Sequence, residues 1–352
     1  MFLAKRKLNN RKYYFLEESI NKSRLSIAIG EKLDKNLIKE AVIELRKKIV
    51  VENAKLAFKN YKIKHLASSQ LLTLETLKYN YKLFKKYFSE SLSSFEIDEF
   101  VRYAQGSTSV EGNSLSLEDA SLIITKGISV TGKKIDEIKE IENLKKVKDA
   151  ILDNKIISEK LIKTIHGIVL DGFLNKNPGN YRTKPVFIIG SNIIPPKAET
   201  VKKEMKQLIN WYNENKTKLH PVELASVLHL QFERIHPFSD GNGRSGREIM
   251  NLVLRKNNYP RAIINLENRE SYISNLQRFI ESKDYFKFTE FIFRCLENRE
   301  KQISKIINDN LDIIADEIIS KELNQKDKNS KKKAKKLLHI KIENLQILKN
   351  CV

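Results

Sequence analysis

Apolar residues recur at helical spacing along most of this 352-residue chain. Leu37, Ala41, Val42 and Leu45, for example, follow one another at intervals that place side chains on one face of a helix. Such patterns predict a mainly α-helical protein, in which each helix buries one face against a shared core. The segments in which we expect helices are residues 36–60, 69–90, 96–110, 135–152, 198–213, 221–235, 242–257, 268–282 and 285–310, and a further helix that Ser158 caps.

Two segments have the features of short β-hairpins instead. Residues 13–30 hold two apolar runs, and residues 182–196 form an extended apolar run that Gly190, Ser191 and Asn192 interrupt. We therefore expect a helical bundle with one small hairpin in its main part and a second short hairpin near the N-terminus.

The formal net charge of +21 raises the question of nucleic-acid binding. Lysines are spread along the whole chain, however, and only residues 331–336 form a cluster, so a biased composition explains the charge better. No helix-turn-helix or zinc-ligand pattern accompanies the charge, since His229 and His236 have no cysteine partners. A basic nucleic-acid-binding regulator is kept as the alternative that is not an enzyme.

Other features of the composition concern the cell compartment. No stretch approaches the ~18 consecutive apolar residues of a membrane span, and the N-terminal residues lack the pattern of a signal peptide. Two cysteines, Cys295 and Cys351, are too few for a disulfide framework. We expect a cytoplasmic protein without a membrane partner.

The most informative segment is HPFSDGNGRSGR, residues 236–247. Pro237 disfavours a helical conformation for the residue before it, so the helix over residues 221–235 should end near His236. Three glycines within six residues then give a tight loop with exposed backbone N–H groups, and another helix follows. Such a loop binds anions, because the unpaired N–H groups and the positive end of the helix dipole both face the ligand.

The side chains of this segment suit a nucleotide. Arg244 and Arg247 share a helix face and can reach successive phosphates. Asp240 supplies a single carboxylate, which is how proteins usually hold Mg²⁺ beside phosphates. His236 is the one group in the loop whose usual pKa, about 6.5, suits proton abstraction near neutral pH. Each feature alone is more often structural, but their combination indicates a phosphate-binding catalytic site.

The segment is similar to the Fic family motif, His-x-Phe-x-Asp/Glu-Gly-Asn-Gly-Arg-x-x-Arg, at every defined position. Residues 178–182 resemble the lead-in to the family's flap, and residues 185–194 resemble the flap itself. The resemblance extends over residues 155–297. It implies a division into an N-terminal helical region with a short hairpin (1–92), an inhibitory helix region (93–126), a Fic catalytic core (127–297) and a C-terminal helix with a lysine-rich tail (298–352).

The resemblance implies a Fic-type helical bundle and a protein adenylyltransferase, which moves AMP from ATP onto a Ser, Thr or Tyr hydroxyl with Mg²⁺ as cofactor. It implies that His236 is the base and that Asp240 binds Mg²⁺. The target protein would pair with the edge of the flap, self-modification is expected, and the oligomeric state, a homodimer included, is left open. The resemblance assigns the anchoring of the loop to Phe238. Tyr272 is a candidate for packing on adenine, and the alternative is an ordinary core aromatic. ATP binding is assigned to Gly241, Asn242, Gly243, Arg244 and Arg247.

Residues 107–113, STSVEGN, are similar to the inhibitory motif Ser/Thr-x-x-x-Glu-Gly/Asn of many Fic proteins. Their place before the core resembles the class with an N-terminal inhibitory helix, class II. Glu111 would pair with Arg247 and occupy the arginine that the γ-phosphate needs, while Ser107 would orient Glu111. The alternative is a surface glutamate at a helix C-terminus.

Two related activities remain as alternatives. Glu111 could activate water to remove AMP from a modified target, and the residues do not separate this role from inhibition. Other Fic relatives transfer a phosphate or another part of a nucleotide, and they tend to depart from the motif at its second glycine or last arginine. Gly243 and Arg247 are both present here, which favours AMP transfer.

Overall fold

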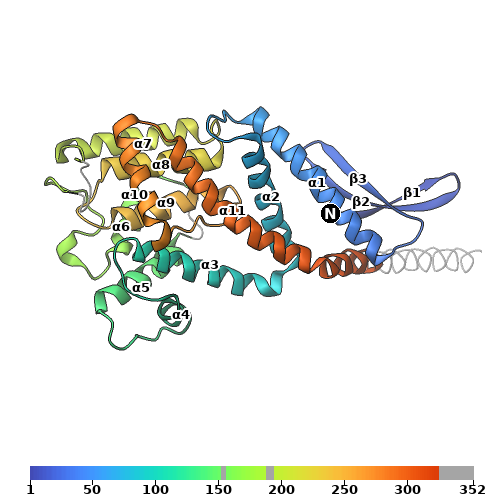
Figure 1. Cartoon of the computed structure of the whole chain (residues 1–352), viewed down its shortest axis with the longest axis horizontal. Coiled ribbons are helices and arrows are strands. Elements are labelled where there is room, and N and C mark those ends of the chain that lie inside the picture. The colour runs from blue at the N-terminus through green and yellow to red at the C-terminus, as the bar shows by residue number, and fades with distance from the viewer. Residues whose placement is uncertain (152–155, 188–193, 325–352) are drawn as a thin grey trace, which may run out of the picture. The chain divides into compact units, whose positions relative to one another are not determined.

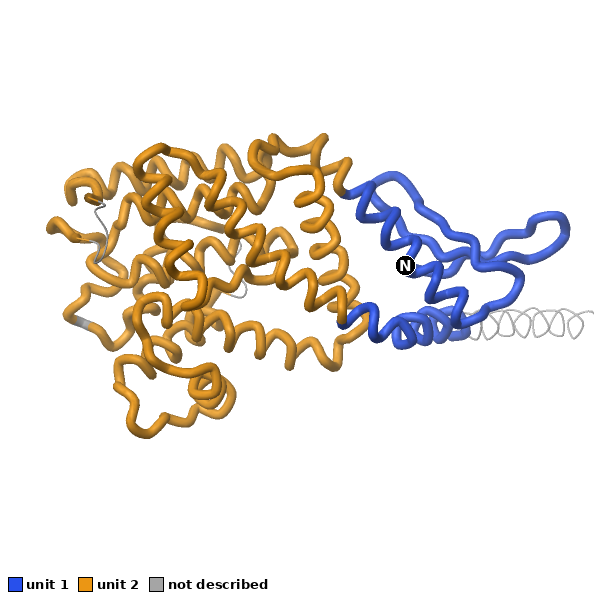
Figure 2. The backbone as a smooth tube through the Cα atoms, in the orientation of Figure 1, with its two compact units in different colours: residues 1–53, 306–352 blue, residues 54–305 orange. Residues whose placement is uncertain are grey.

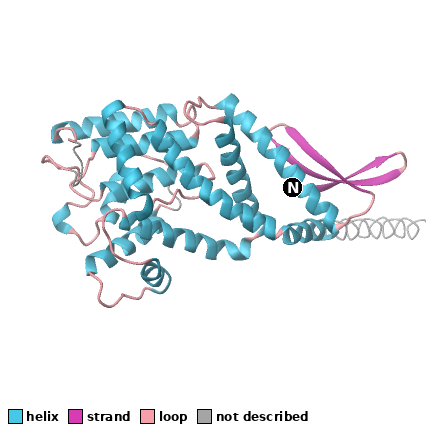
Figure 3. Cartoon of the chain, in the orientation of Figure 1, coloured by secondary structure: helices cyan, strands magenta, loops and turns pink. Residues whose placement is uncertain are grey.

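The computed structural model describes residues 1–151, 156–187 and 194–324. Helices make up most of these residues (Figure 3), which confirms the prediction of a mainly α-helical protein. The helices are α1 (Lys35–Asn60), α2 (Ser68–Tyr87), α3 (Ser89–Ser109), α4 (Leu117–Lys126), α5 (Ile135–Ala150), α6 (Glu159–Val169), α7 (Val201–Asn215), α8 (Pro221–Ile235), α9 (Asn242–Lys256), α10 (Arg269–Ser282) and α11 (Phe286–Asp309), and residues 311–324 are also helical.

The chain divides into two compact units (Figure 2). Unit 1 comprises residues 1–53 and 306–352, and unit 2 comprises residues 54–305. The boundary falls within α1 and within α11. The glycine-rich segment and the inhibitory motif both belong to unit 2, so the site is described within that unit. The division into four parts that the resemblance implies stays a prediction.

Unit 1 contains a small antiparallel sheet of β1 (Phe2–Leu8), β2 (Arg11–Ile20) and β3 (Ser23–Gly30), in the order β1-β2-β3. Asn10 and Asn21 lie in the two tight turns with φ of 60° and 53°, a left-handed conformation that asparagine tolerates better than most residues. The predicted N-terminal hairpin corresponds to β2 and β3. Strand β1 extends it and was not predicted from the sequence.

Helix α8 is the central element of unit 2. Side chains such as Leu224, Leu228 and Phe232 are buried along nearly its whole length, and it contacts α7, α9 and α10 (Figure 1). Pro221 lies at its first turn, where the missing N–H costs no helical hydrogen bond. Helix α9 packs on α8 and also contacts α3 and α6. The loop between α8 and α9 is therefore held at both ends by buried helices.

Two helix assignments need correction. Helix α3 begins at Ser89, earlier than the predicted start at residue 96. Helix α4 was not predicted, although its sequence carries clear end signals. The Ser116 hydroxyl accepts a hydrogen bond from the Asp119 backbone N–H (3.1 Å), and Gly127 ends the helix in a left-handed conformation.

The hairpin predicted over residues 182–196 falls partly outside the described part of the chain, because its middle, residues 188–193, is not described. Within residues 183–187 and 194–197, the structure has no strand. Phe187 and Ile194, on either side of the gap, have largely exposed side chains. The flap hairpin therefore stays a prediction.

Two further predictions, those about membrane spans and cysteines, can be compared with the structure in the residues that it describes. None of the described helices combines the length and apolar character that a membrane crossing requires. Cys295 is a buried free thiol, and Cys351 lies outside the described residues.

Candidate active site

His236 forms the C-terminal cap of α8. Its backbone is left-handed, with φ of 47°, and its N–H donates to the carbonyl oxygen of Phe232 (2.9 Å). Burial lowers the pKa of the imidazole to about 4, although the backbone of Glu233 favours the charged form. The imidazole is therefore neutral near neutral pH, which is the form that can accept a proton.

Arg182 holds the backbone around His236. Its Nε donates to the His236 carbonyl oxygen (2.8 Å), its Nη2 donates to the Pro196 carbonyl oxygen (2.5 Å), and its backbone N–H donates to the Pro237 carbonyl oxygen (2.9 Å). The side chain is buried. The sequence indicated Arg182 only as part of the lead-in to the flap, whereas the structure identifies it as the support of the histidine.

Phe238 and Asn242 hold the loop from inside. Phe238 is fully buried, and its ring stacks on His166 with 3.6 Å between ring centroids. The Asn242 side chain accepts from the Phe238 N–H (3.0 Å) and donates to the Phe238 carbonyl oxygen (2.9 Å). Because these bonds occupy the Asn242 side chain, contact between Asn242 and a phosphate would come from its backbone N–H.

His166, in α6, is a second support that was not predicted from the sequence. Its Nδ1 accepts a hydrogen bond from the Gly179 N–H (2.9 Å), so Nε2 carries the proton and donates to the Asp240 carbonyl oxygen (2.9 Å). The imidazole thus ties the motif loop to the segment before the flap. Its one sequence signal is a histidine on the apolar face of a helix, a pattern that usually indicates a structural role.

The glycines form a cradle at the start of α9. Gly241 is the N-cap with φ of 71°, and a side-chain carbon added there would press on Leu170. A side-chain carbon added at Gly243 would overlap the carboxylate of Glu111 and crowd the guanidinium of Arg247. The Glu111 carboxylate therefore lies against the first turn of α9, where a helix stabilises an anion.

Arg247 is buried and faces the inhibitory motif. Its Nη2 donates to Glu111 Oε1 (2.8 Å) and to the Ser107 carbonyl oxygen (2.6 Å), and its Nε donates to Ser107 Oγ (3.0 Å). Burial disfavours the charge of Arg247, but Glu111 outweighs it, so the pKa lies above its usual value. The structure brings together the two residues that the resemblance paired. Ser107 contacts Arg247 directly through its hydroxyl and its carbonyl oxygen, and its assignment as the residue that orients Glu111 stays a prediction.

Tyr272 lies in an aromatic cluster with His229, Phe288 and Phe291. Its hydroxyl is 2.9 Å from His229 Nε2 and accepts a longer hydrogen bond from Arg247 Nη1 (3.5 Å). Its ring is buried. This geometry corresponds to the core-aromatic alternative, since contact with adenine would require the cluster to open.

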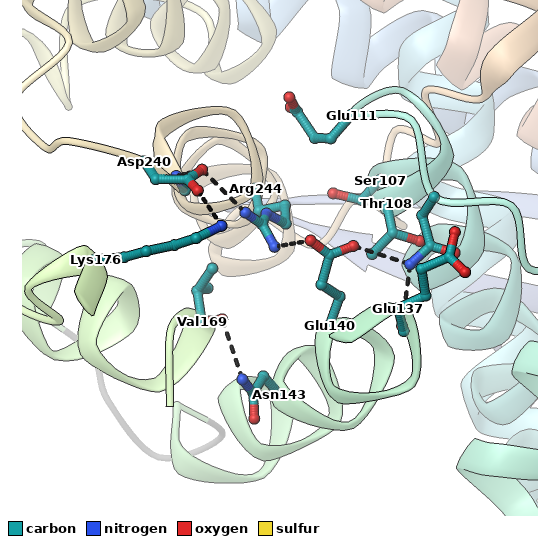
Figure 4. Close-up of polar contacts among 12 residues, drawn as sticks. Ser107, Thr108, Glu111, Glu137, Glu140, Asn143, Val169, Lys176, Asp240 and Arg244 are labelled. Atoms are coloured by element: carbon teal, nitrogen blue, oxygen red, sulfur yellow. Dashed lines mark hydrogen bonds and ion pairs between the residues drawn. The ribbon is translucent and has the colours of Figure 1, made fainter. Parts of the chain in front are cut away.

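Asp240 and Arg244 lie in a chain of ion pairs (Figure 4). Arg244 Nη1 is 2.5 Å from Glu140 Oε1 and its Nη2 is 3.3 Å from Asp240 Oδ1, while Asp240 Oδ2 is 2.5 Å from Lys176 Nζ. Burial raises the pKa of Asp240, but Lys176 and Arg244 outweigh it, so the pKa lies below its usual value. Lys176 and Glu140 were not predicted from the sequence, where each is one charged residue among many.

The residues around Asp240 fit a divalent metal that arrives with phosphates. Across residues 1–151, 156–187 and 194–324, no three His, Cys, Asp or Glu side chains gather to hold a metal by themselves. Asp240 supplies one carboxylate beside the α9 cradle. Mg²⁺ is usually held by one or two carboxylates with phosphate and water completing its shell, so the donor set suits a metal–nucleotide complex.

Glu233 is a buried carboxyl next to the histidine, and it was not predicted from the sequence. Its Oε2 is 3.9 Å from His236 Nδ1. Burial raises its pKa to about 8 against the opposing effect of Arg247. Glu233 is therefore largely protonated at neutral pH, so it adds little negative charge beside Arg247.

The buried histidines predict a pH-dependent stability. Burial lowers the pKa of His166 and His236 to about 4 and of His220 and His229 to about 3, from a usual 6.5. The unfolded chain therefore binds protons first as the pH falls, so their contribution to stability is present above pH 6.5 and is lost toward pH 4 and below. Glu233, with its raised pKa, has the opposite sign, but it is one group against four.

We expect the free energy of unfolding to be lower at about pH 5 than at about pH 7. Urea unfolding at the two pH values, followed by circular dichroism, measures the difference. An equal or higher urea midpoint at the lower pH would contradict the expectation.

Comparison with known proteins places this site in a family. Residues 156–254 match the Fic/DOC family. A protein adenylyltransferase Fic from Aedes aegypti is 35% identical over 213 residues, which are 59% of this chain and 42% of that protein, and one from Culex quinquefasciatus is also 35% identical, over 58% of this chain and 42% of its own length. This chain thus spans less than half the length of these relatives.

A solved structure of a Fic family protein from Desulfovibrio desulfuricans superposes with a TM-score of 0.61 at 25% identity, covering 70% of this chain and 77% of that one. The family match over residues 156–254 includes α6, α8 and most of α9, which flank the motif loop. This chain therefore carries a Fic/DOC family domain.

Proposed function

We propose that this protein is a protein adenylyltransferase, which transfers AMP from ATP to a Ser, Thr or Tyr hydroxyl of a target protein. The observation that carries the proposal is the anion cradle at the start of α9, which lies next to a neutral buried histidine and already holds a carboxylate. The names of the relatives, protein adenylyltransferase Fic, support the same activity.

The reaction assigns a distinct task to each part of the site. The target oxygen attacks the α-phosphorus of ATP, the bond from that phosphorus to its bridging oxygen breaks, and pyrophosphate leaves. His236 takes the proton of the hydroxyl as the new bond forms. Arg244 and Arg247 neutralise the β- and γ-phosphates, and the N–H groups of Gly241, Asn242 and Gly243 hold them. Catalysis then depends chiefly on positioning and charge neutralisation.

Asp240 would hold Mg²⁺ in this scheme. A bound Mg²⁺ would supply positive charge that neutralises the phosphates and helps to orient the triphosphate. The protein's own contribution is to fix the Asp240 carboxylate, which its bonds to the Gly241 N–H (2.5 Å) and to Arg244 do.

The same site is autoinhibited in our proposal, in the manner of Fic proteins with an N-terminal inhibitory helix. The Glu111 carboxylate accepts a hydrogen bond from the Arg247 guanidinium and fills the space over Gly243. A γ-phosphate would need both, so ATP and the Glu111 carboxylate compete. Ser107 keeps Arg247 in place for either partner.

Target binding is assigned to the flap at residues 185–194. The exposed apolar side chains of Phe187 and Ile194 support an acceptor segment docking there, and pairing through its backbone would suit varied target sequences. Self-modification, a homodimer and a cytoplasmic location stay predictions of the sequence.

Isotopic labels separate AMP transfer from phosphate transfer. The chain is incubated with Mg²⁺ and ATP that is labelled at either the α- or the γ-phosphate, alone and with a cell extract. We expect label on protein from the α position only, and a mass increase of one AMP on the modified residue. Label from the γ position would overturn AMP transfer in favour of phosphate transfer. Loss of α-label from an already modified target would indicate AMP removal.

A further inference from the structure

We propose that Lys176 neutralises the Asp240 carboxylate while no metal is bound, and that the metal–nucleotide complex displaces it. The inference rests on the proposed function, because it takes Asp240 as the metal ligand. It adds a residue that lies outside the motif and that determines how strongly nucleotide binding depends on metal.

Both oxygens of Asp240 have partners. Oδ1 accepts from the Gly241 N–H (2.5 Å) and from Arg244 Nη2 (3.3 Å), and Oδ2 contacts Lys176 Nζ (2.5 Å). Figure 4 shows the Lys176 side chain extended toward this carboxylate, on the side opposite Glu111. A metal ion on Oδ2 would take the position of the ammonium group, so the two cations exclude each other.

Lys176 is the cation that can leave. Its side chain is 36% exposed and that of Asp240 is 37% exposed, so water screens their attraction. Arg244, by contrast, is 4% exposed and is also held by Glu140. An ion pair that is screened on one side gives way to a divalent ion more easily than a buried one.

The backbone of Lys176 is fixed, whereas its side chain is partly exposed to solvent. The residue ends the short 3-10 turn Leu174–Lys176, and its N–H donates to the Phe173 carbonyl oxygen (2.9 Å). Its carbonyl oxygen accepts from the Ser239 hydroxyl (2.9 Å), which ties the turn to the motif loop. The ammonium group therefore stays near the phosphate site after displacement.

These contacts predict opposite effects on metal-free and metal-bound nucleotide. Without metal, Lys176 offsets the Asp240 charge, so the triphosphate approaches a carboxylate that is paired on both oxygens instead of one whose only cationic partner is Arg244. With metal, the ion pair must first break. Removing the ammonium group should therefore weaken metal-free binding and should leave metal-bound binding equal or tighter.

The experiment measures binding of a fluorescent ATP analogue, mant-ATP, to the full chain by fluorescence anisotropy, in EDTA and in Mg²⁺. For Lys176→Ala we expect the dissociation constant to rise about 3- to 10-fold in EDTA and to fall by up to about 5-fold in Mg²⁺. Lys176→Arg should restore the behaviour of the unchanged chain. Lys139→Ala is the matched control, since its ammonium group lies over the same Phe173 ring (5.7 Å, against 5.2 Å for Lys176) and pairs with no atom of Asp240.

The outcomes separate the inference from the proposed function. Equal weakening of Lys176→Ala in both conditions would make Lys176 an ordinary phosphate ligand and overturn the inference, as would no change in either. Asp240→Asn should lose the gain in affinity that Mg²⁺ gives; if it keeps that gain, the metal assignment and the inference both fail. If neither the unchanged chain nor Glu111→Gly, which lacks the competing carboxylate, binds nucleotide in either condition, the proposed function itself is overturned.

Discussion

Replacing Glu111 with glycine is expected to raise the rate of AMP transfer, self-modification included, by about 10-fold or more. The change removes a charge-assisted hydrogen bond to Arg247 and empties the space over Gly243. Such bonds contribute about 1.5–3 kcal/mol, or roughly 10- to 100-fold. Because Glu111 is 39% exposed, solvent screening places the effect toward the lower end. Initial rates of incorporation from α-labelled ATP measure it.

A matched control distinguishes release of the site from a general effect of glycine. Glu118→Gly makes the same substitution seven residues later, at an exposed position in the first turn of α4. It should leave the rate near that of the unchanged chain. Equal rates for Glu111→Gly and the unchanged chain, with both proteins folded, would remove the autoinhibition proposal and leave the transfer activity to be judged separately.

His236→Ala is expected to lower the rate of AMP transfer by about 10²- to 10⁴-fold, the usual contribution of a positioned general base. The loss is best measured in the Glu111→Gly background, where the starting rate is high. Nucleotide affinity should change little, because the phosphate contacts come from the α9 cradle and its arginines. Rates of AMP transfer and affinities for mant-ATP, measured on the same variant, test whether the rate falls while the affinity stays the same.

His65→Ala serves as the control for the histidine. His65 is a partly buried histidine that packs on Tyr285 and belongs to no part of the candidate site. It should keep full activity. Label that persists in His236→Ala at a comparable rate would overturn the assignment of the base, even if the protein still binds ATP.

The motif loop could be predicted from the sequence because its functional residues lie close together in the sequence. His236, Asp240, Arg244 and Arg247 follow one another within one helix end, one loop and one helix start, so local rules place them together. The pairing of Glu111 with Arg247 depended on the family resemblance, since these residues are far apart in the chain. The structure adds one contact that was not predicted, that of Ser107 with Arg247.

The supports of the site could not be predicted in the same way. Contacts with the segment from His236 to Arg244 come from residues that lie between 54 and 104 positions away along the chain, namely His166, Arg182, Glu140 and Lys176. Nothing in the local pattern distinguishes an arginine that binds backbone carbonyls from one in solvent. Such residues become visible only when packing fixes which atoms are buried together.

The missed elements have a different physical cause. Strand β1 carries the charged run Lys5, Arg6 and Lys7, which hides its alternation, and pairing with β2 provides the stability that its own sequence does not indicate. Helix α4 is short, so its apolar positions make few periods, although Ser116 and Gly127 marked both of its ends.

Arg182 gives the domain a mechanical property. Its guanidinium donates hydrogen bonds to two backbone carbonyl oxygens. One belongs to His236, at the end of α8, and the other to Pro196, just after the flap. If a target docks on the flap as proposed, a displacement at Pro196 would be transmitted to the backbone of His236 through a single rigid, planar group. In the proposed reaction, acceptor docking on the flap and proton removal by His236 would both depend on Arg182, so a poorly docked acceptor would also meet a misaligned base.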